Sequence, residues 1–199
     1  MDKIFPHRIH KLKVKNYKDL NKKLISEIYD LKDDNELGIK RSNYGGWHSK
    51  DYFVYENSAT ELKDISKIIS DFYSDTILKN GKNVKMSTIW ANINGKDSYN
   101  GPHTHPGSHY SGCYYVKVPK NSGDLYFIDR GTSLTPPYNQ FKKIYDEIKI
   151  KPEEGMLYLW TGELGHRVGK NKTDKDRISI SFNFDYKDIG EQLKEQNDK

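Results

Sequence analysis

The sequence has one cysteine, Cys113, and no apolar run that approaches the length of a membrane span. A single cysteine excludes an intramolecular disulfide and suits a reducing compartment. A membrane-spanning helix needs about 20 consecutive apolar residues, and residues 1–13 lack the apolar core of a signal peptide. These absences exclude a disulfide-stapled fold and predict a cytoplasmic protein without a membrane segment.

Charge of one sign is not concentrated anywhere in the chain. The 33 Lys and Arg exceed the 28 Asp and Glu by five, yet acidic residues lie among the basic ones throughout. The densest basic stretch, residues 8–23, is interrupted by apolar side chains, which favours a solvated face over a nucleic-acid surface.

Apolar residues are also scarce, at 34%, and this alone would favour a solvated chain. However, 15 Tyr, 7 Phe and 3 Trp supply the large buried areas that disordered segments lack. We find no internal repeat and no low-complexity tract. With 199 residues, the chain is expected to fold as one domain.

Two helices are predicted in the first half of the chain. Apolar residues in 16–31 recur with helical spacing and form one stripe among charged residues. Ser58 and Glu61 have the spacing of a capping box, and the helix that they open is expected to end near Asn80 and Gly81. The intervening residues 41–55 contain a Gly-Gly pair flanked by aromatics and suit a turn between short extended pieces.

From Val84 onward the sequence predicts strands. Short runs rich in β-branched and aromatic residues alternate with Gly, Pro, Asn and Asp, and the runs are 84–94, 109–118, 124–129, 147–150, 156–160 and 177–186. We therefore expect a mainly β protein with N-terminal helices, of the α+β class, built as a sandwich, jelly roll or barrel. The expected division is a helical support over 1–82, a jelly-roll core over 83–187 and a polar tail over 188–199.

Histidines are concentrated in the segment 101–112, GPHTHPGSHYSG. In an extended chain, His103 and His105 point to the same side and can meet one metal ion. A divalent metal site needs at least a third protein ligand, which usually comes from a distant strand. His166 is the only histidine after the cluster and is therefore the candidate.

A buried cation is expected near these histidines. Arg177 and Ser179 alternate in a predicted strand and so share one face. An arginine at the bottom of an apolar pocket can bind a carboxylate through two hydrogen bonds. The alternative is a surface ion pair between Arg177 and Asp174 or Asp176.

The histidines also have possible structural roles in which they bind no metal. His103 and His105 could be a loop pair bonded to the backbone. His109 lies beyond Pro106 and Gly107, which break the strand register, and so it is a rim or pocket residue rather than a fourth ligand. The sequence does not separate a rim position from a surface position for His48.

Five ordered motifs resemble a known family. They are Ser-Asn-Tyr-Gly-Gly-Trp at 42–47, Trp-Ala-Asn-Ile at 90–93, His-Thr-His-Pro at 103–106, Ser-Gly-Cys-Tyr-Tyr at 111–115 and the stretch from Arg177 to Asn183. Together they resemble iron(II)- and 2-oxoglutarate-dependent oxygenases of the double-stranded β-helix (cupin-like jelly-roll) fold, in a group distantly similar to prolyl hydroxylases. The resemblance spans residues 41 to 186.

The resemblance implies a site and a reaction. Fe(II) would be held by His103, His105 and His166, with His105 standing where the superfamily has a carboxylate, unless Asp124, Asp129 or Glu163 completes the site. Arg177 and Ser179 would bind the distal carboxylate of 2-oxoglutarate, with Asn92, Asn94 and Tyr115 as further contacts. O₂ and 2-oxoglutarate would be consumed, succinate and CO₂ formed, and an unknown substrate hydroxylated.

Two other functions remain compatible with the sequence. One is a cupin-like three-histidine metalloprotein whose chemistry does not use 2-oxoglutarate, and the other is a non-catalytic binding module. For the oxygenase, we favour a small molecule or a peptide over nucleic acid as the substrate. The oligomeric state is left open, with a homodimer among the options.

Overall fold

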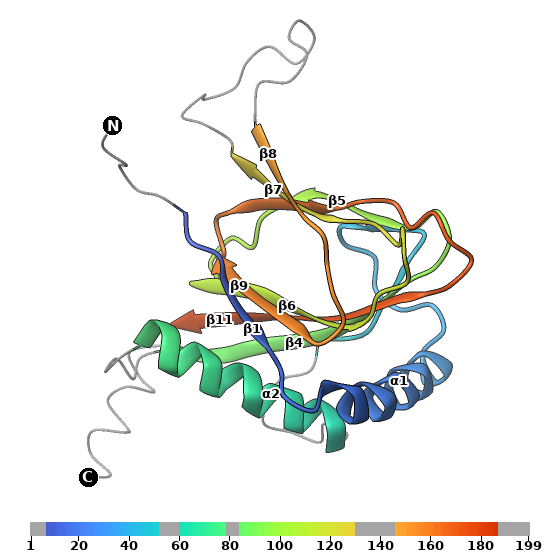
Figure 1. Ribbon diagram of the computed structural model, residues 1–199, viewed down its shortest axis with the longest axis horizontal. Coiled ribbons are helices and arrows are strands. Elements are labelled where there is room, and N and C mark those ends of the chain that lie inside the picture. The colour runs from blue at the N-terminus through green and yellow to red at the C-terminus, as the bar shows by residue number, and fades with distance from the viewer. Residues whose placement is uncertain (1–6, 52–59, 79–83, 130–145, 187–199) are drawn as a thin grey trace, which may run out of the picture.

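The computed structural model describes residues 7–51, 60–78, 84–129 and 146–186 (Figure 1). The elements, in chain order, are β1 (His10–Lys13), α1 (Tyr17–Asp34), β2 (Asn43–Tyr44), β3 (Trp47–His48), α2 (Thr60–Tyr73), a π-helical turn (Ser74–Leu78), β4 (Val84–Asn94), β5 (Tyr99–His103), β6 (Tyr110–Lys117), β7 (Leu125–Asp129), β8 (Asp146–Ile150), β9 (Met156–Thr161), β10 (Gly165–Val168) and β11 (Arg177–Tyr186). None of the helices described is long and apolar enough to cross a membrane.

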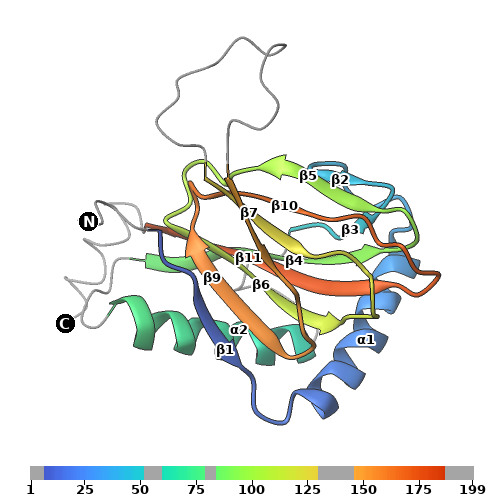
Figure 2. The same ribbon diagram turned by 45° about the horizontal axis from the view of Figure 1, so that its top comes forward.

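The strands form two antiparallel sheets. The larger has six strands in the order β1-β9-β6-β11-β4-β3, and the smaller has five in the order β2-β5-β10-β7-β8. Figure 2 shows the two sheets as stacked layers, with β5, β10 and β7 lying over β4, β11 and β6. This arrangement confirms the predicted jelly roll with N-terminal helices.

Strand alternation gives the larger sheet two different faces. Its outer face is apolar and, together with the buried stripes of α1 and α2, forms the main core, which includes Leu24, Ile28, Ile65, Ile69, Ile89, Ala91, Tyr114, Val116, Ile178, Ile180 and Phe182. Both helices lie under this face in Figure 1. Because successive side chains of a strand point to opposite faces, the alternate residues of β11, from Arg177 to Asn183, point into the space between the sheets.

The predicted helices and strands are found, with shifted ends. The helix expected over 16–31 is α1, and the second helix runs from Thr60 and continues as the π-helical turn to Leu78. Its capping box and its end at Asn80 and Gly81 lie outside the described residues. All six strand runs are confirmed as β4, β6, β7, β8, β9 and β11.

Several short strands went unpredicted. β1 pairs with β9 in the larger sheet although it lies in the most basic stretch of the chain. β5 has the sequence YNGPH, which contains three poor strand formers, and β10 has only four residues. Each of them is held by pairing with neighbouring strands: β1 pairs with β9, β5 with β2 and β10, and β10 with β5 and β7.

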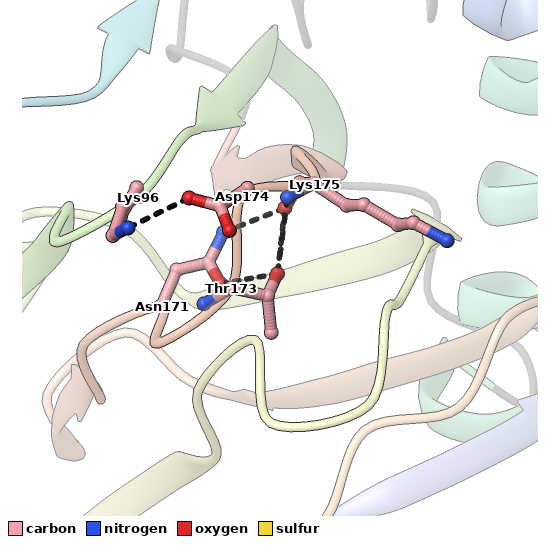
Figure 3. A network of polar contacts seen from close by, with 5 residues as sticks. All are labelled: Lys96, Asn171, Thr173, Asp174 and Lys175. Atoms are coloured by element: carbon pink, nitrogen blue, oxygen red, sulfur yellow. Dashed lines mark hydrogen bonds and ion pairs between the residues drawn. The ribbon is translucent and has the colours of Figure 1, made fainter.

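One buried side chain, Asn171, organises the connection between β10 and β11. Its Nδ2 donates to the carbonyls of Asn94 (2.8 Å) and Lys175 (2.9 Å). Its Oδ1 accepts from the backbone N–H and the hydroxyl of Thr173, both at 3.0 Å (Figure 3). Its own backbone N–H donates to the carbonyl of Ser98. Asn171 therefore fixes the loop that leads into Arg177.

We predict that Asn171→Ala lowers the free energy of unfolding by about 2–4 kcal/mol, because it leaves buried backbone groups without partners. Urea denaturation measures this loss. Lys96→Ala is the matched control, because Lys96 pairs with Asp174 in the same loop through side chains that are 61% and 84% exposed. The control should cost less than about 1 kcal/mol, and equal losses in both variants would contradict the role of Asn171.

Candidate functional site

Two strands and a loop bring three histidines together between the sheets. His166 of β10 lies directly opposite His103 of β5 in the antiparallel register. His105 follows two residues after β5, and its backbone N–H donates to the carbonyl of Gly162 at 2.8 Å. One ligand atom from each of the three imidazoles lies within 4.8 Å of the others.

The backbone sets which nitrogen of each ring faces the centre. The Nδ1 of His103 is 2.8 Å from the carbonyl of Gly101, and the Nδ1 of His166 is 2.9 Å from the carbonyl of Leu164. A carbonyl only accepts, so each Nδ1 carries the proton and each Nε2 keeps its lone pair. This tautomer is the one that a metal ligand needs.

The spacing of the lone pairs fits one metal ion. The Nε2 atoms of His105 and His166 are 3.3 Å apart. Two nitrogens at about 2.0–2.1 Å from a common metal lie about 3.0 Å apart in octahedral geometry and about 3.4 Å apart in tetrahedral geometry. The pair formed by His105 and His166 is therefore already spaced as it would be on a bound divalent cation.

All three imidazoles are held neutral. Burial is the main cause that lowers the pKa of His105, to about 4, and the neighbouring His103 and Arg41 lower it further. Burial also lowers the pKa of His103, and it places the pKa of His166 well below the usual value. Neutral imidazoles are the form that binds metal, so the site needs no deprotonation near neutral pH.

No carboxylate joins the three histidines in the part of the chain that is described. Asp124 forms an ion pair with Lys149 at 3.8 Å, and Glu163 is exposed. The side chain of Asp129 is outside the described residues. Asp124 and Glu163 therefore do not join the three histidines. Among the described residues, the possible metal ligands are three imidazoles.

Arg177 lies in the same cavity and is 1% exposed. Its Nη1 donates to the carbonyl of Ser122 at 2.9 Å and lies 3.5 Å from the carbonyls of Gly123 and Gly169. Its Nε is buried without a partner. Among the described residues no carboxylate forms an ion pair with this guanidinium, so the surface pairing with Asp174 or Asp176 is not found.

Gly123 is required behind this arginine. Its φ is +99°, and a Cβ there would come within 2.1 Å of the Gly169 carbonyl and 2.8 Å of Arg177 Nη1. Only glycine adopts this conformation without strain and leaves room for the guanidinium. The turn before β7 is therefore shaped around Arg177.

A cavity of about 360 Å³ joins the histidines to Arg177. Ser179, Asn92 and Tyr115 line it as well, whereas Asn94 does not. Asn94 instead donates toward Asn100 and accepts from Asn171 through its backbone carbonyl.

The cavity differs between its two ends. Apolar side chains line it near Arg177, including Leu125 and Val168, and burial raises the pKa of the Cys113 thiol there to about 12. Toward the other end the lining is polar and includes Ser42, Ser181 and Asn183, which sequence reasoning missed. All three lie in quoted motifs, Ser42 in the one at 42–47 and the other two in the stretch from Arg177 to Asn183, but the motifs assigned no role to these residues.

His48 and His109, whose positions the sequence left open, lie in different surroundings. His48 is buried and lines the cavity, with its ring stacked on Trp90 at a centroid distance of 5.5 Å. His109 does not line the cavity, and its Nδ1 lies 3.0 Å from the hydroxyl of Tyr73. Neither belongs to the group of possible metal ligands.

Sequence comparison identifies one family. The family described as "Putative 2OG-Fe(II) oxygenase" matches residues 88–183, which run from within β4 to within β11 and include all three histidines and Arg177. No functionally curated protein matches the sequence.

Solved structures share the fold at low sequence identity. A prolyl-4-hydroxylase from Pseudomonas putida superposes with a TM-score of 0.66 at 13% identity, covering 92% of this chain and 94% of the other. The viral collagen prolyl hydroxylase of Paramecium Bursaria Chlorella virus-1, in its 2OG complex, gives 0.59 at 15% identity, with coverages of 88% and 94%. HygX from Streptomyces hygroscopicus, with nickel and 2-oxoglutarate bound, gives 0.63 at 10% identity, with coverages of 89% and 82%.

The lowered histidine pKa values predict acid sensitivity of the metal-free protein. Folding depresses the pKa of His105 from 6.5 to about 4, so the unfolded chain takes up a proton that the folded chain excludes. The stability is present above pH 6.5 and is lost as the pH falls toward 4. His105→Asn, which stays neutral, should lose about 1–2 kcal/mol less than the parent between about pH 7 and about pH 5.

Urea denaturation of chelator-treated protein at the two pH values measures this difference. If parent and variant lose the same stability on acidification, His105 is not held neutral by the fold.

Proposed function

We propose that this protein, an iron(II)- and 2-oxoglutarate-dependent oxygenase by its family match and its fold, holds its metal on His103, His105 and His166. The support is the convergence of the three imidazoles. In His103 and His166, the Nδ1 proton is directed away from the centre, toward a backbone carbonyl. Two histidines and one carboxylate, with open positions, are the typical ligand set of non-haem Fe(II) oxygenases. Here the third ligand is His105.

Arg177 binds the distal carboxylate of 2-oxoglutarate in this proposal, and one observation carries the assignment. The guanidinium is buried, its Nε has no partner, and it lies in the cavity that contains the histidines. A buried cation without an anion is costly, and a carboxylate that bonds its free N–H groups removes the cost. Ser179 and Tyr115 lie on neighbouring strands in direct register and can add hydrogen bonds.

The other side chains orient the cosubstrate. Leu125 and Val168 provide apolar surface for its methylene groups, and Asn92, whose Nδ2 donates to Ser181 at 3.1 Å, contributes a fixed polar group. The bound iron supplies the oxidising chemistry that couples decarboxylation of 2-oxoglutarate to hydroxylation of the substrate. The chain's part is to align the two molecules and to exclude water from the space between the sheets.

The primary substrate is a small molecule or a group on a peptide rather than nucleic acid. Support comes from the size of the cavity, about 360 Å³, which is near the lower end of the usual range of about 300–1,000 Å³ for ligand sites. Among similar structures, one is HygX with hygromycin B bound and another is a Trichoplax adhaerens prolyl hydroxylase with a peptide fragment. A cytoplasmic location fits the single buried thiol.

Anaerobic titration with Fe(II) and 2-oxoglutarate tests the function directly. We predict a weak visible charge-transfer band that appears only when both are present, and succinate release once air is admitted. A site that binds Fe(II) without the band would overturn the 2-oxoglutarate assignment and favour the three-histidine alternative. Absence of metal binding would favour a binding module.

Arg177→Met should weaken 2-oxoglutarate binding at least about 100-fold, because the buried carboxylate loses its partner, while Fe(II) binding stays close to that of the parent. The matched control is Arg167→Met. Arg167 lies next to His166 in β10 but its guanidinium bonds Glu147 on β8. Titration of the charge-transfer band compares the variants, and equal 2-oxoglutarate affinity in both would argue against Arg177.

A further inference from the structure

The side chain of Ser42 lies beside the proposed metal ligands, although neither packing nor metal binding gives its hydroxyl a role. It lies just before β2, lines the cavity, and its Oγ is 3.5 Å from Nε2 of His103, the lone-pair nitrogen. Its backbone is fixed, because its carbonyl accepts the N–H of Gly101 at 2.8 Å and the side chain of Asn43 bonds the carbonyl of Gly46. The hydroxyl is thus held beside the metal centre by a segment distant in sequence from the histidines.

Among the described residues, the proton of this hydroxyl has no good acceptor. The Nδ2 of Asn100 donates toward Ser42 Oγ at 3.4 Å, which uses the oxygen as an acceptor. The hydroxyl can then donate only to another group, and the neighbour present is His103 Nε2 at 3.5 Å. That distance exceeds the roughly 2.5–3.0 Å of a good hydroxyl hydrogen bond.

Metal binding removes even this acceptor. A metal on His103 occupies the Nε2 lone pair at about 2.0–2.1 Å. The Ser42 proton then needs another acceptor, which a ligand atom bound to the same metal can supply. The strongest available acceptor is an anionic oxygen, since hydrogen bonds to charged groups are about twice as strong as neutral ones.

We propose that the Ser42 hydroxyl donates a hydrogen bond to the metal-chelating end of 2-oxoglutarate, as a cosubstrate-binding residue supplied by the N-terminal segment. The inference rests on the proposed function, because it requires the metal on His103 and the cosubstrate on that metal. Arg177 then holds one end of 2-oxoglutarate and Ser42 the other. The two contacts come from opposite sheets, and together they fix both the position and the direction of the molecule.

The experiment is anaerobic titration of Fe(II)-loaded protein with 2-oxoglutarate, followed by the charge-transfer band. For Ser42→Ala we expect the Kd of 2-oxoglutarate to rise about tenfold or more, the effect of losing one hydrogen bond to a charged group. The band maximum should also move, because the chelating oxygen loses its donor. Fe(II) affinity measured without 2-oxoglutarate should not fall.

Two further variants make the result specific. Ser42→Thr keeps the hydroxyl and should restore the Kd and the band position. Ser108→Ala removes another hydroxyl that lines the same cavity, and among the described residues that hydroxyl has no hydrogen bond to the three histidines. It should leave both readouts unchanged.

The outcomes separate this inference from the proposed function. If the parent protein forms no band, the function itself fails. If the parent forms the band and Ser42→Ala matches Ser108→Ala in Kd and band position, the function stands and the role of Ser42 is overturned. A change in oxygen reactivity with unchanged Kd and band also overturns it.

Discussion

The buried guanidinium of Arg177 is the constraint on which the site depends. An unpaired charge removed from water costs several kcal/mol unless other groups compensate it, and the fold compensates only part of it, through backbone carbonyls that bond Nη1. Those carbonyls are in place because Gly123 lets the turn approach and because Asn171 fixes the loop before β11. Arg177 also lines the cavity, and in the proposed function an anion bound there completes the compensation of its charge.

The strand that carries Arg177, β11, lines the cavity with one face and packs into the core with the other. Residues of β11 alternate between the space between the sheets and the helix-covered face, so each functional residue is flanked in sequence by core residues such as Ile178 and Ile180. The two helices bury the apolar face without entering the site. The inner face of the smaller sheet is covered by the larger sheet rather than by a helix. This face contributes His103 and His166 to the space between the sheets.

Much of this arrangement could be predicted from the sequence, and the reasons for the failures are physical. Long alternating runs such as β11 reveal a strand and its two faces, and the order of His103, His105, His166 and Arg177 indicated one site. Short strands such as β5 and β10 carry too few residues for a pattern and form through pairing. Asn171 reaches the distant backbone carbonyl of Asn94, and Ser42 lies beside a ring nitrogen of the distant His103. No local spacing encodes these contacts.

The absence of a carboxylate from the described metal centre changes the electrostatic balance of the cavity. A divalent metal held as proposed by three neutral imidazoles would keep its full charge, and Arg177 adds a further positive charge to the same cavity. Cys113 and Tyr115 are kept protonated by burial and offset none of it. A dianion with carboxylates at both ends matches this distribution of charge, one end at the metal and one at the guanidinium. Under the proposed ligand set, with His105 in place of a carboxylate, the site is one charge more positive, which would favour binding of 2-oxoglutarate and make the metal more dependent on its cosubstrate for charge neutralisation.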